Sequence, residues 1–357
     1  GVIELCREYL STLKVRAFRQ HLLIYLCSFT GKDIYATVFV FFAVYCLNLT
    51  SADAAEILSL SIVGIPTTIL GGFLLIKIGP GNLYKISYST ILACLVGFFA
   101  IYVYNPASKL ALMFVIGFFF QIGRQILEFT PWNVFPFIPD VDEIISQKRR
   151  EGLFAAVMTF SRKTTVALAT FLVGVVMQMG GFVKGQSIQS PEAIATIANM
   201  LFIGTGGLIL ISLVLAAGFK LNKQTHAILI HEIERLKAGG AKEDVTTEAK
   251  AVCENLTGYA YEQLWPQTLE KSAAQAEELE MAKKILADIG GDYKIDYYTY
   301  CATRLRIKLN ERGLEDPVLL EKINAMRGAV LTGQELQILL GEKSSKVYDS
   351  LHLLLGR

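Results

Sequence analysis

The sequence predicts an all-α membrane bundle of six transmembrane helices, followed by a small α/β sandwich domain at the C-terminal end. Of its 357 residues, 53% are hydrophobic and only 18% are charged, a composition too apolar for a uniformly soluble protein. The apolar residues are concentrated before about residue 220, after which Lys, Glu and Asp return at the density usual for globular domains. The chain is therefore expected to occupy two environments, lipid and water.

Six apolar stretches are long enough to cross a bilayer, which takes roughly 20 residues in a helix. Lys and Arg gather in the connections on one side, for example at 148–150, whereas the opposite connections hold only Lys109 and Lys184. Because basic loops stay in the cytoplasm, both ends of the chain are expected to be cytoplasmic, in a multi-pass protein of the cell (inner or plasma) membrane. The stretches lie near residues 20–47, 54–77, 86–104, 109–129, 153–179 and 197–219.

Composition also excludes several classes of partner and cofactor. The formal net charge is +2 and the polar part carries no basic stripe with interleaved aromatic residues, so nucleic acid is not an expected partner. The six cysteines form no CxxC pair, so neither a zinc site nor a disulfide framework is indicated, and no cofactor is expected. The chain opens with Gly1 rather than Met, and the natural protein is expected to begin earlier.

Charged residues inside the first span are candidates for a substrate or cation pathway. Lys32 and Asp33 lie near its middle, where a charge is costly and usually faces a cavity. Neighbouring helix residues point about 100° apart, so their partners are expected on other helices. A purely structural ion pair to another helix is an equally weighted alternative.

Two further charged pairs lie in the fourth and fifth spans. Arg124 and Glu128 have i,i+4 spacing, which favours a structural pair within one helix. Arg162 and Lys163 lie about ten residues into the fifth span, deep enough that reaching the headgroups is strained for both. Lys163 is the preferred pathway residue of these two.

The loop from Pro139 to Lys163 carries a recurring motif. It reads PDVDEIISQKRREGLFAAVMTFSRK and resembles the glycoside-pentoside-hexuronide:cation symporters of the major facilitator superfamily, as does the tail from Phe219 to Gly240. The resemblance implies that Lys163 lies near a sugar and cation pocket. It also implies a coupling cation, sodium or proton.

That family has twelve spans, so residues 1–222 would be the second six-helix half of a major facilitator fold. Its pocket would be covered by an N-terminal six-helix half, which becomes an expected partner together with a sugar and membrane lipid. The family's cation-site carboxylates lie in the other half. Alone, this chain is not expected to transport.

The polar part divides into a tail helix with linker at 223–272 and a compact domain at 273–357. The tail helix around 226–237, with Glu232, Glu234 and Lys237, is expected to present an ordinary solvated face. The compact domain has a helix at 273–289, strands at 295–301 and 303–309, a helix at 317–326, two short strands in RGAVLTG and ELQILLG, and a helix at 343–355.

Cys301 is the candidate nucleophile of this domain. It ends a predicted strand, and Thr303, Arg304 and Arg306 follow, so nearby guanidinium groups could favour its thiolate and hold phosphoryl oxygens. On the residues alone, a single Cys between strands is more often a small packing residue. The element CATRLR, with Gln337 and Gly341 further on, resembles the IIB domain of the glucose-type phosphotransferase system. The resemblance implies that Cys301 accepts phosphate from a histidine of a IIA protein, assisted by Thr303, Arg304 and Arg306.

Three functional interpretations follow. The preferred one is cation-coupled sugar symport, with phosphate on Cys301 regulating transport. The alternative is a phosphotransferase component that passes phosphate from Cys301 to the transported sugar; only this interpretation includes an enzymatic activity, protein-phosphocysteine–sugar phosphotransferase. The third is a fusion relic in which neither part works.

Overall fold

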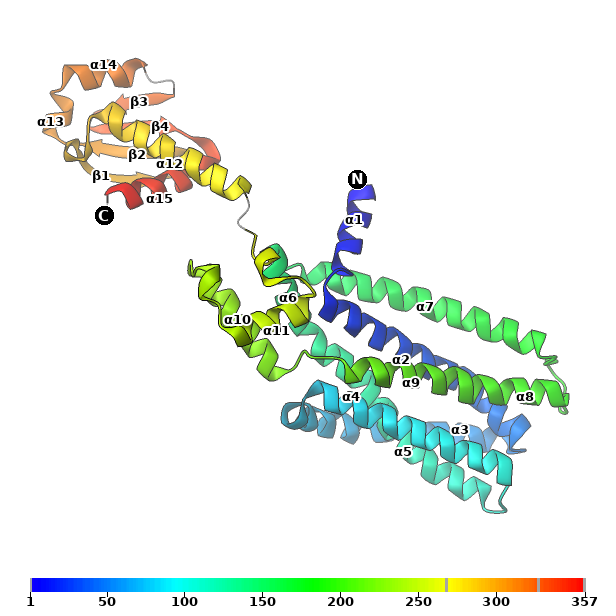
Figure 1. Cartoon of the computed structure of the whole chain (residues 1–357). Coiled ribbons are helices and arrows are strands. Elements are labelled where there is room, and N and C mark those ends of the chain that lie inside the picture. The colour runs from blue at the N-terminus through cyan, green and yellow to red at the C-terminus, as the bar shows by residue number, and fades with distance from the viewer. Residues whose placement is uncertain (1, 267–268, 326–327, 356–357) are drawn as a thin grey trace. The chain divides into compact units, whose positions relative to one another are not determined.

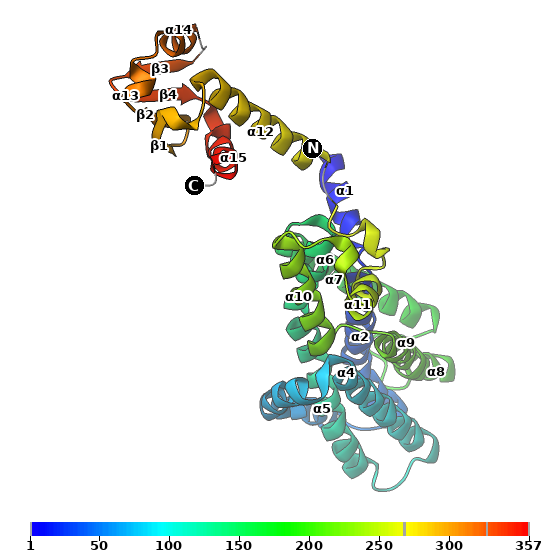
Figure 2. The ribbon, with the colours of Figure 1, turned by 60° about the vertical axis from the view of Figure 1, so that its left-hand side comes forward.

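The computed structural model describes residues 2–266, 269–325 and 328–355. Contacts divide the chain into two compact units, Gly1–Pro266 and Gln267–Arg357, and each has its own cluster of buried apolar residues. Figures 1 and 2 show that helices make up the first unit, whereas the second contains a sheet. The expected boundaries at 222 and 272 stay a prediction; in the structure the segment 223–266 groups with the first unit.

Long helices lying side by side form the membrane part of the first unit (Figure 1). Several begin with a side-chain cap; in α3, for example, Thr50 accepts a hydrogen bond from the Asp53 N–H at 3.0 Å. The helices of the unit are α1 (Val2–Thr12), α2 (Arg16–Phe41), α3 (Ser51–Ser59), α4 (Gly64–Tyr104), α5 (Lys109–Val134), α6 (Ile138–Ser146), α7 (Glu151–Met179), α8 (Pro191–Asn199), α9 (Gly206–Ala217), α10 (Lys223–Lys237) and α11 (Thr247–Thr257).

Short π and 3-10 segments join several of these helices into longer runs. The π segments Phe42–Cys46 and Met200–Thr205 extend α2 and link α8 to α9, while 3-10 turns at Leu60–Val63 and Phe135–Phe137 link α3 to α4 and α5 to α6. Among the described residues, five such runs are long and apolar enough to cross a membrane. The expectation of a helical multi-pass protein is confirmed, but the count of five continuous runs differs from the expected six. The runs are Arg16–Cys46, Ser51–Tyr104, Lys109–Ser146, Glu151–Met179 and Pro191–Ala217.

The difference in number arises in the second run, Ser51–Tyr104, which has 54 residues. A straight helix of that length would measure about 81 Å, against a hydrocarbon core of about 30 Å. The helix breaks at Gly79, whose φ of 78° and ψ of 167° are non-helical, and Pro80 starts the next segment.

The chain reverses direction at this break. Four contacts with α5 show this reversal. Before Gly79, later residues of the run contact later residues of α5, so the two segments are parallel. After Gly79, later residues contact earlier residues of α5, so the two segments are antiparallel. The pairs are Gly64 with Gln125, Gly71 with Phe129, Ile91 with Gly123 and Gly97 with Ile116. Two antiparallel legs therefore flank α5.

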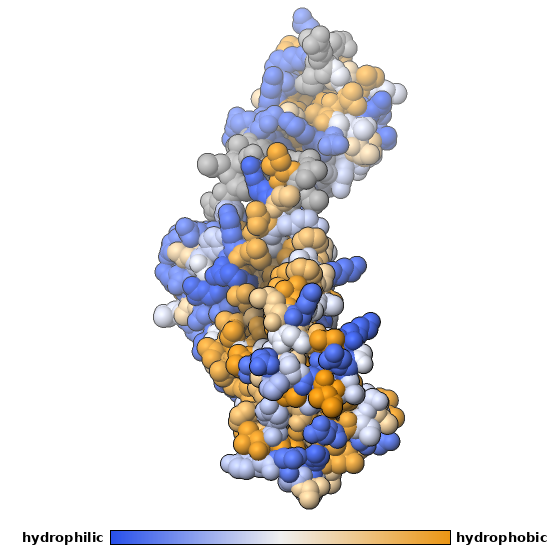
Figure 3. Space-filling model, turned by 90° about the vertical axis from the view of Figure 1, so that its right-hand side faces the viewer, coloured by the Kyte–Doolittle hydropathy of each residue, from blue (hydrophilic) through white to orange (hydrophobic). Residues whose placement is uncertain are grey.

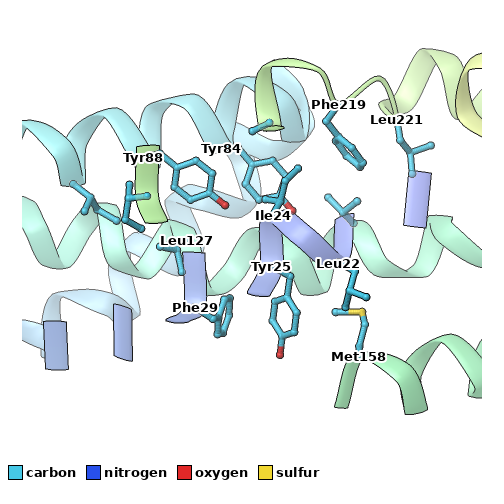
Figure 4. Close-up of a cluster of buried hydrophobic side chains, with 14 of the residues drawn as sticks. Leu22, Ile24, Tyr25, Phe29, Tyr84, Tyr88, Leu127, Met158, Phe219 and Leu221 are labelled. Carbon is cyan, nitrogen blue, oxygen red and sulfur yellow. The ribbon is translucent and has the colours of Figure 1, made fainter. Parts of the chain in front are cut away.

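Aromatic side chains from several helices fill the core of the first unit. Figure 4 shows Tyr84 and Tyr88 of α4 on one side of Leu127 of α5, and Tyr25 and Phe29 of α2 on its other side. All of these aromatic residues are buried. Interdigitated large side chains of this kind fix helix positions because each would leave a cavity if removed.

The outer surface of the helices is strongly apolar. Phe73, Phe160 and Phe171 are 70%, 73% and 66% exposed, and Figure 3 shows hydrophobic side chains reaching the surface of this unit. Such exposure is unfavourable in water but normal against lipid. The surface therefore agrees with a position in a membrane.

A helical cap of residues 223–266 closes one end of the first unit. Its α10 and α11 bury Leu229, Ile233 and Leu256, and the Trp265 N–H donates to the Ile144 carbonyl at 2.7 Å. Lys237 also forms an ion pair with Glu143 at 2.5 Å. The cap is thus packed against α6 rather than extended as a linker.

The expectation of an ordinary solvated face on α10 is wrong for Glu232. This carboxylate is only 2% exposed; it accepts hydrogen bonds from Arg235 at 2.8 and 2.9 Å and from the hydroxyl of Tyr261. The sequence pattern does not reveal this burial because Tyr261 comes from outside the helix. Burial alone would raise the Glu232 pKa, but Arg235 and Tyr261 outweigh it and lower the pKa.

The second unit is a four-stranded antiparallel sheet in the order β1-β2-β4-β3 with helices packed on one face. The predicted strands and helices of this unit are confirmed, and the chain also forms a short additional helix. The elements are α12 (Leu269–Ile289), β1 (Ile295–Tyr300), β2 (Arg304–Leu309), α13 (Glu311–Leu314), α14 (Pro317–Ala325), β3 (Ala329–Thr332), β4 (Glu335–Leu339) and α15 (Ser344–Leu355).

Candidate functional sites

One face of the sheet in the second unit is not covered by the unit's helices. Along β2 the side chains of Leu305, Ile307 and Leu309 are buried, while Arg304, Arg306 and Lys308 between them are exposed or half-buried. This alternation follows from the two-residue period of a strand. The uncovered face therefore carries a row of cations.

Cys301 lies in the tight turn between β1 and β2, at the edge of this face. Its N–H donates to the Arg304 carbonyl at 2.9 Å, which closes the turn. The Thr303 carbonyl accepts hydrogen bonds from the N–H groups of Leu340 and Gly341, each at 2.9 Å. Gly341 has a φ of 59°, a left-handed conformation that favours glycine. The turn is therefore held on both sides by backbone hydrogen bonds.

This turn favours the thiolate of Cys301. The backbone N–H groups of Thr303 and Arg304, and the nearby charge of Arg306, hold the Cys301 pKa below its ordinary value. Cys253 in the cap shows the opposite behaviour, because burial raises its pKa to about 12. Cys301 is also partly exposed, unlike the buried Cys253.

The two arginines beside Cys301 are connected through side chains of β4. Arg304 Nη1 donates to Gln337 Oε1 at 2.9 Å, and Gln337 Nε2 donates to Glu335 Oε1 at 2.7 Å. Arg306 Nη1 lies 3.8 Å from the same Glu335 oxygen. Gln337 was expected from the sequence, but Glu335 was not. The available signal was its position two residues before Gln337, which places both side chains on one sheet face.

A network of charged side chains joins α2, α5 and α7 in the membrane part. Asp33 Oδ2 lies 2.6 Å from Arg162 Nη1, so the expectation of partners on other helices is met by α7. Glu128 Oε1 lies 3.2 Å from Lys32 Nζ and 3.0 Å from Arg124 Nε. The network thus contains three cations and two carboxylates, and the Arg124–Glu128 pair also engages Lys32.

An aromatic ring lies beneath two of these cations. Lys32 Nζ is 4.6 Å, and the Arg162 guanidinium carbon 5.2 Å, from the centre of the Phe29 ring. Cation–π attraction adds to the ion pairs in holding the two side chains. Phe29 was not singled out from the sequence, although it lies three and four positions before Lys32 and Asp33, on the same helix face.

Lys163 lies apart from this network. Its side chain is exposed and borders a shallow hollow of about 440 Å³ lined by Ala155, Ala156, Thr159 and Phe160. Within residues 2–266 the neighbouring Arg162, rather than Lys163, forms the ion pair with α2. The structure therefore brings Lys32, Asp33 and Arg162 together and leaves Lys163 on another side of α7.

The acidic and basic residues of the loop motif pair with each other at the end of the bundle beside the cap. Arg150 donates two hydrogen bonds to Asp142, at 2.8 and 2.6 Å. Asp140 lies 3.4 Å from Arg149 and 2.7 Å from His226 of α10. The motif thus ties α6, the loop before α7 and the cap into one structure.

The match to a family model decides which family the first unit represents. Residues 2–223 match the model described as MFS/sugar transport protein. The chain belongs to this sugar-transport family. Because the match covers all of the membrane helices, it confirms the resemblance to sugar symporters.

Similar proteins fall into two groups that correspond to the two parts of the chain. An uncharacterized symporter of Synechocystis is 28% identical over 174 residues, covering 47% of this chain and 30% of its own length. A candidate sulfoquinovose importer of Salmonella typhimurium is 27% identical over 232 residues, covering 64% of this chain and 47% of its own length. The chain therefore spans at most about half the length of either relative.

The second group resembles the C-terminal part. The sucrose-specific EIIBC component of the phosphotransferase system of Staphylococcus xylosus is 34% identical over 77 residues, which is 21% of this chain and 16% of that protein. The chain thus combines a sugar-transport family part with a phosphotransferase IIB-like part, as the sequence predicted.

Proposed function

We propose that the chain is the second half of a cation-coupled sugar symporter whose IIB-like unit accepts phosphate on Cys301 and thereby regulates transport. The observation that carries this proposal is the fusion of a sugar-transport family part to a unit in which the turn 301–304 lowers the pKa of a partly exposed thiol. A structural cysteine has no need of such a turn.

The membrane part would cross the bilayer six times. The reversal at Gly79 divides the 54-residue run into two legs, and each is long enough to span separately. With the basic loops inside, both chain ends and the IIB-like unit would lie in the cytoplasm of a cell-membrane protein. An N-terminal six-helix half, from the same or another chain, would complete the transporter.

The charged network would form one wall of the sugar pathway. Lys32, Asp33 and Arg162 keep 15%, 25% and 18% of their side-chain surface exposed, so they are not sealed in the core. Their polar groups could bind sugar hydroxyls, whereas the coupling cation, sodium or proton, would need carboxylates from the other half. Lys163 would face that half or the substrate from the exposed side of α7.

Phosphoryl transfer would use the Cys301 thiolate as nucleophile. Its sulfur attacks the phosphorus of a IIA phosphohistidine, an S–P bond forms, the P–N bond breaks, and the histidine nitrogen leaves with the electron pair. Arg304 and Arg306 would neutralise the phosphoryl oxygens; the hydrogen bond from the Thr303 N–H to the Cys301 sulfur supports the thiolate as the reacting form. The added phosphate brings nearly two negative charges, which could then act on the basic residues of the cytoplasmic loops.

The alternative function is transfer of this phosphate to the transported sugar. It is favoured by the similarity to EIIBC components, which combine a IIB part with a membrane part. The membrane part here belongs to another family, which is why regulation is the preferred proposal.

The test is mass spectrometry of the full chain in detergent after incubation with phosphoenolpyruvate, the general phosphotransferase proteins and IIA proteins. Phosphate is expected on the peptide containing Cys301. It should be absent from Cys301→Ala and retained in Cys6→Ala, which removes another exposed cysteine.

Adding candidate sugars to the phosphorylated chain separates the two functions. Stable phosphocysteine supports regulation, whereas loss of phosphate with formation of sugar phosphate supports transfer. No phosphate from any IIA donor on a folded chain would refute both.

A further inference from the structure

A cavity of about 830 Å³ opens beside the reversal of α4. It lies where the break in α4, the C-terminal end of α5 and the start of the cap meet. Its lining includes Lys77, Gly79, Val134, Phe137, Lys223 and His226. None of these residues belongs to the charged network or to the Cys301 turn.

Two cations of this lining have no acidic partner. Lys77 and Lys223 are exposed, and within residues 2–266 neither forms an ion pair. His226 does have a partner, Asp140, which also pairs with Arg149. Because the carboxylate of Asp140 is engaged by these two side chains, the charge of the lysines remains uncompensated.

Besides Asn133, Asn222 and Gln224, the lining includes an apolar part, which continues onto the outer surface of α4. Val134 and Phe137 line the cavity together with Ile76, which is 74% exposed, and Phe73 one turn earlier is 70% exposed. Apolar side chains this exposed on a membrane leg are suited to contact acyl chains. Cations and apolar surface thus meet at one opening.

We propose that this cavity binds the headgroup of an anionic phospholipid. The phosphate oxygens would accept hydrogen bonds from the ammonium groups of Lys77 and Lys223, while the acyl chains would cover Phe73 and Ile76. A free phosphate ion would satisfy the lysines but leave the apolar surface bare. The proposal needs only the membrane part and is independent of the activity assigned to Cys301.

The test is native mass spectrometry of the full chain in detergent with phosphatidylglycerol or phosphatidylcholine of identical acyl chains. The wild-type chain is expected to retain phosphatidylglycerol preferentially. Removing both charges in Lys77→Gln/Lys223→Gln should weaken this retention about thirtyfold, as two interfacial lysines allow, without changing retention of phosphatidylcholine.

A matched control is Lys14→Gln/Lys85→Gln, which removes two exposed lysines outside the cavity lining and should retain phosphatidylglycerol like the wild type. Circular dichroism and size-exclusion chromatography confirm that each variant is folded. Equal retention of the two lipids, an equal loss in both variant pairs, or displacement of phosphatidylglycerol by inorganic phosphate would overturn the proposal.

Discussion

Cys301 differs from the other cysteines of the chain because its turn supplies donors directly to the sulfur. The N–H groups of Thr303 and Arg304 contribute most to the lowering of its pKa, and Arg306 adds a positive charge. All three favour the thiolate over the thiol. The reactivity of this residue should therefore respond to single changes around the turn.

Replacing Arg306 with Gln should raise the Cys301 pKa, since one charge that stabilises the thiolate is lost. The rate of alkylation of Cys301 by iodoacetamide, followed by mass spectrometry across pH, should reach its half-maximum at a higher pH in the variant. Lys308→Gln, two residues further along the same strand face, is the matched control. Equal shifts in both variants would mean that only the general charge of the face matters.

The Asp33–Arg162 pair holds α2 and α7 together. Arg162→Ala should lower the free energy of unfolding by about 1–3 kcal/mol, because a partly buried carboxylate loses its closest cation and keeps only Lys32, 3.9 Å away. Thermal unfolding in detergent measures this loss, with exposed Lys184→Ala as control. In the double variant Asp33→Ala/Arg162→Ala the two losses should be less than additive; strict additivity would show that the pair contributes nothing.

Glu232 should make the cap sensitive to acid. Its folded-state pKa is lowered, so the stability it adds is present above its unfolded pKa, near 4.3, and is lost as pH falls through the folded value. Thermal unfolding of wild type and Glu232→Gln should therefore differ most near neutral pH and converge in acid. A difference that stays constant with pH would contradict this.

Sequence reasoning identified most individual residues but not their partners. Cys301 and its arginines follow from one local motif, and local hydrogen bonds produce the turn. By contrast, the pairing of Asp33 with Arg162 depends on helix packing between residues far apart in the chain. Glu232 and Arg235 have the same i,i+3 spacing whether solvated or buried, so only the position of Tyr261 distinguishes the two cases.

At the scale of elements, the break in α4 decides how the helices pack. Gly79 combines a φ of 78° with a ψ of 167°, a region essentially restricted to glycine. The antiparallel legs on both sides of α5 depend on this one residue. The Gly-Pro dipeptide was visible in the sequence, and the predicted spans 54–77 and 86–104 already lie on either side of it.

Gly79→Ala should therefore destabilise the first unit by about 1–3 kcal/mol through backbone strain. Thermal unfolding in detergent is the measurement. Gly81→Ala is a matched control two residues away, because Gly81 does not have a positive φ and a Cβ there would meet nothing closer than 3.9 Å. Similar losses in both variants would argue against strain at the break.

The strands of the second unit were predictable because alternation along TRLRIKL directly encodes a strand with one buried face. Their order was not, since β4 inserts between β2 and β3 and no local pattern specifies that neighbour. This order matters for the site: it brings Gln337 and Glu335 beside the arginines of β2.

At the scale of the whole molecule, the cap belongs with the membrane helices. Composition changes near residue 220 and gives no sign of packing beyond that point, so the sequence placed residues 223–272 in a tail. The side chains Leu229, Ile233 and Leu256 nevertheless join the main apolar core of the first unit. Tertiary contacts, which composition does not report, account for the difference.

Truncation should show whether residues 223–266 are a dispensable tail or a cap that stabilises the membrane helices. A chain ending at Pro266 should purify as a monodisperse particle with the unfolding temperature of the first unit unchanged. A chain ending at Asn222 should unfold at a lower temperature and aggregate, because the surfaces of α2 and α6 that contact the cap become exposed. Size-exclusion chromatography and thermal unfolding give the comparison; equal behaviour would show that the cap is dispensable.

The reversal at Gly79 also constrains how the chain is made. The legs on either side meet at a single non-helical residue. No long polar loop separates them that could stay in water while each leg inserts on its own. We therefore expect both legs to enter the lipid together, as a helical hairpin. A polar substitution in either leg is then expected to impair the insertion of both.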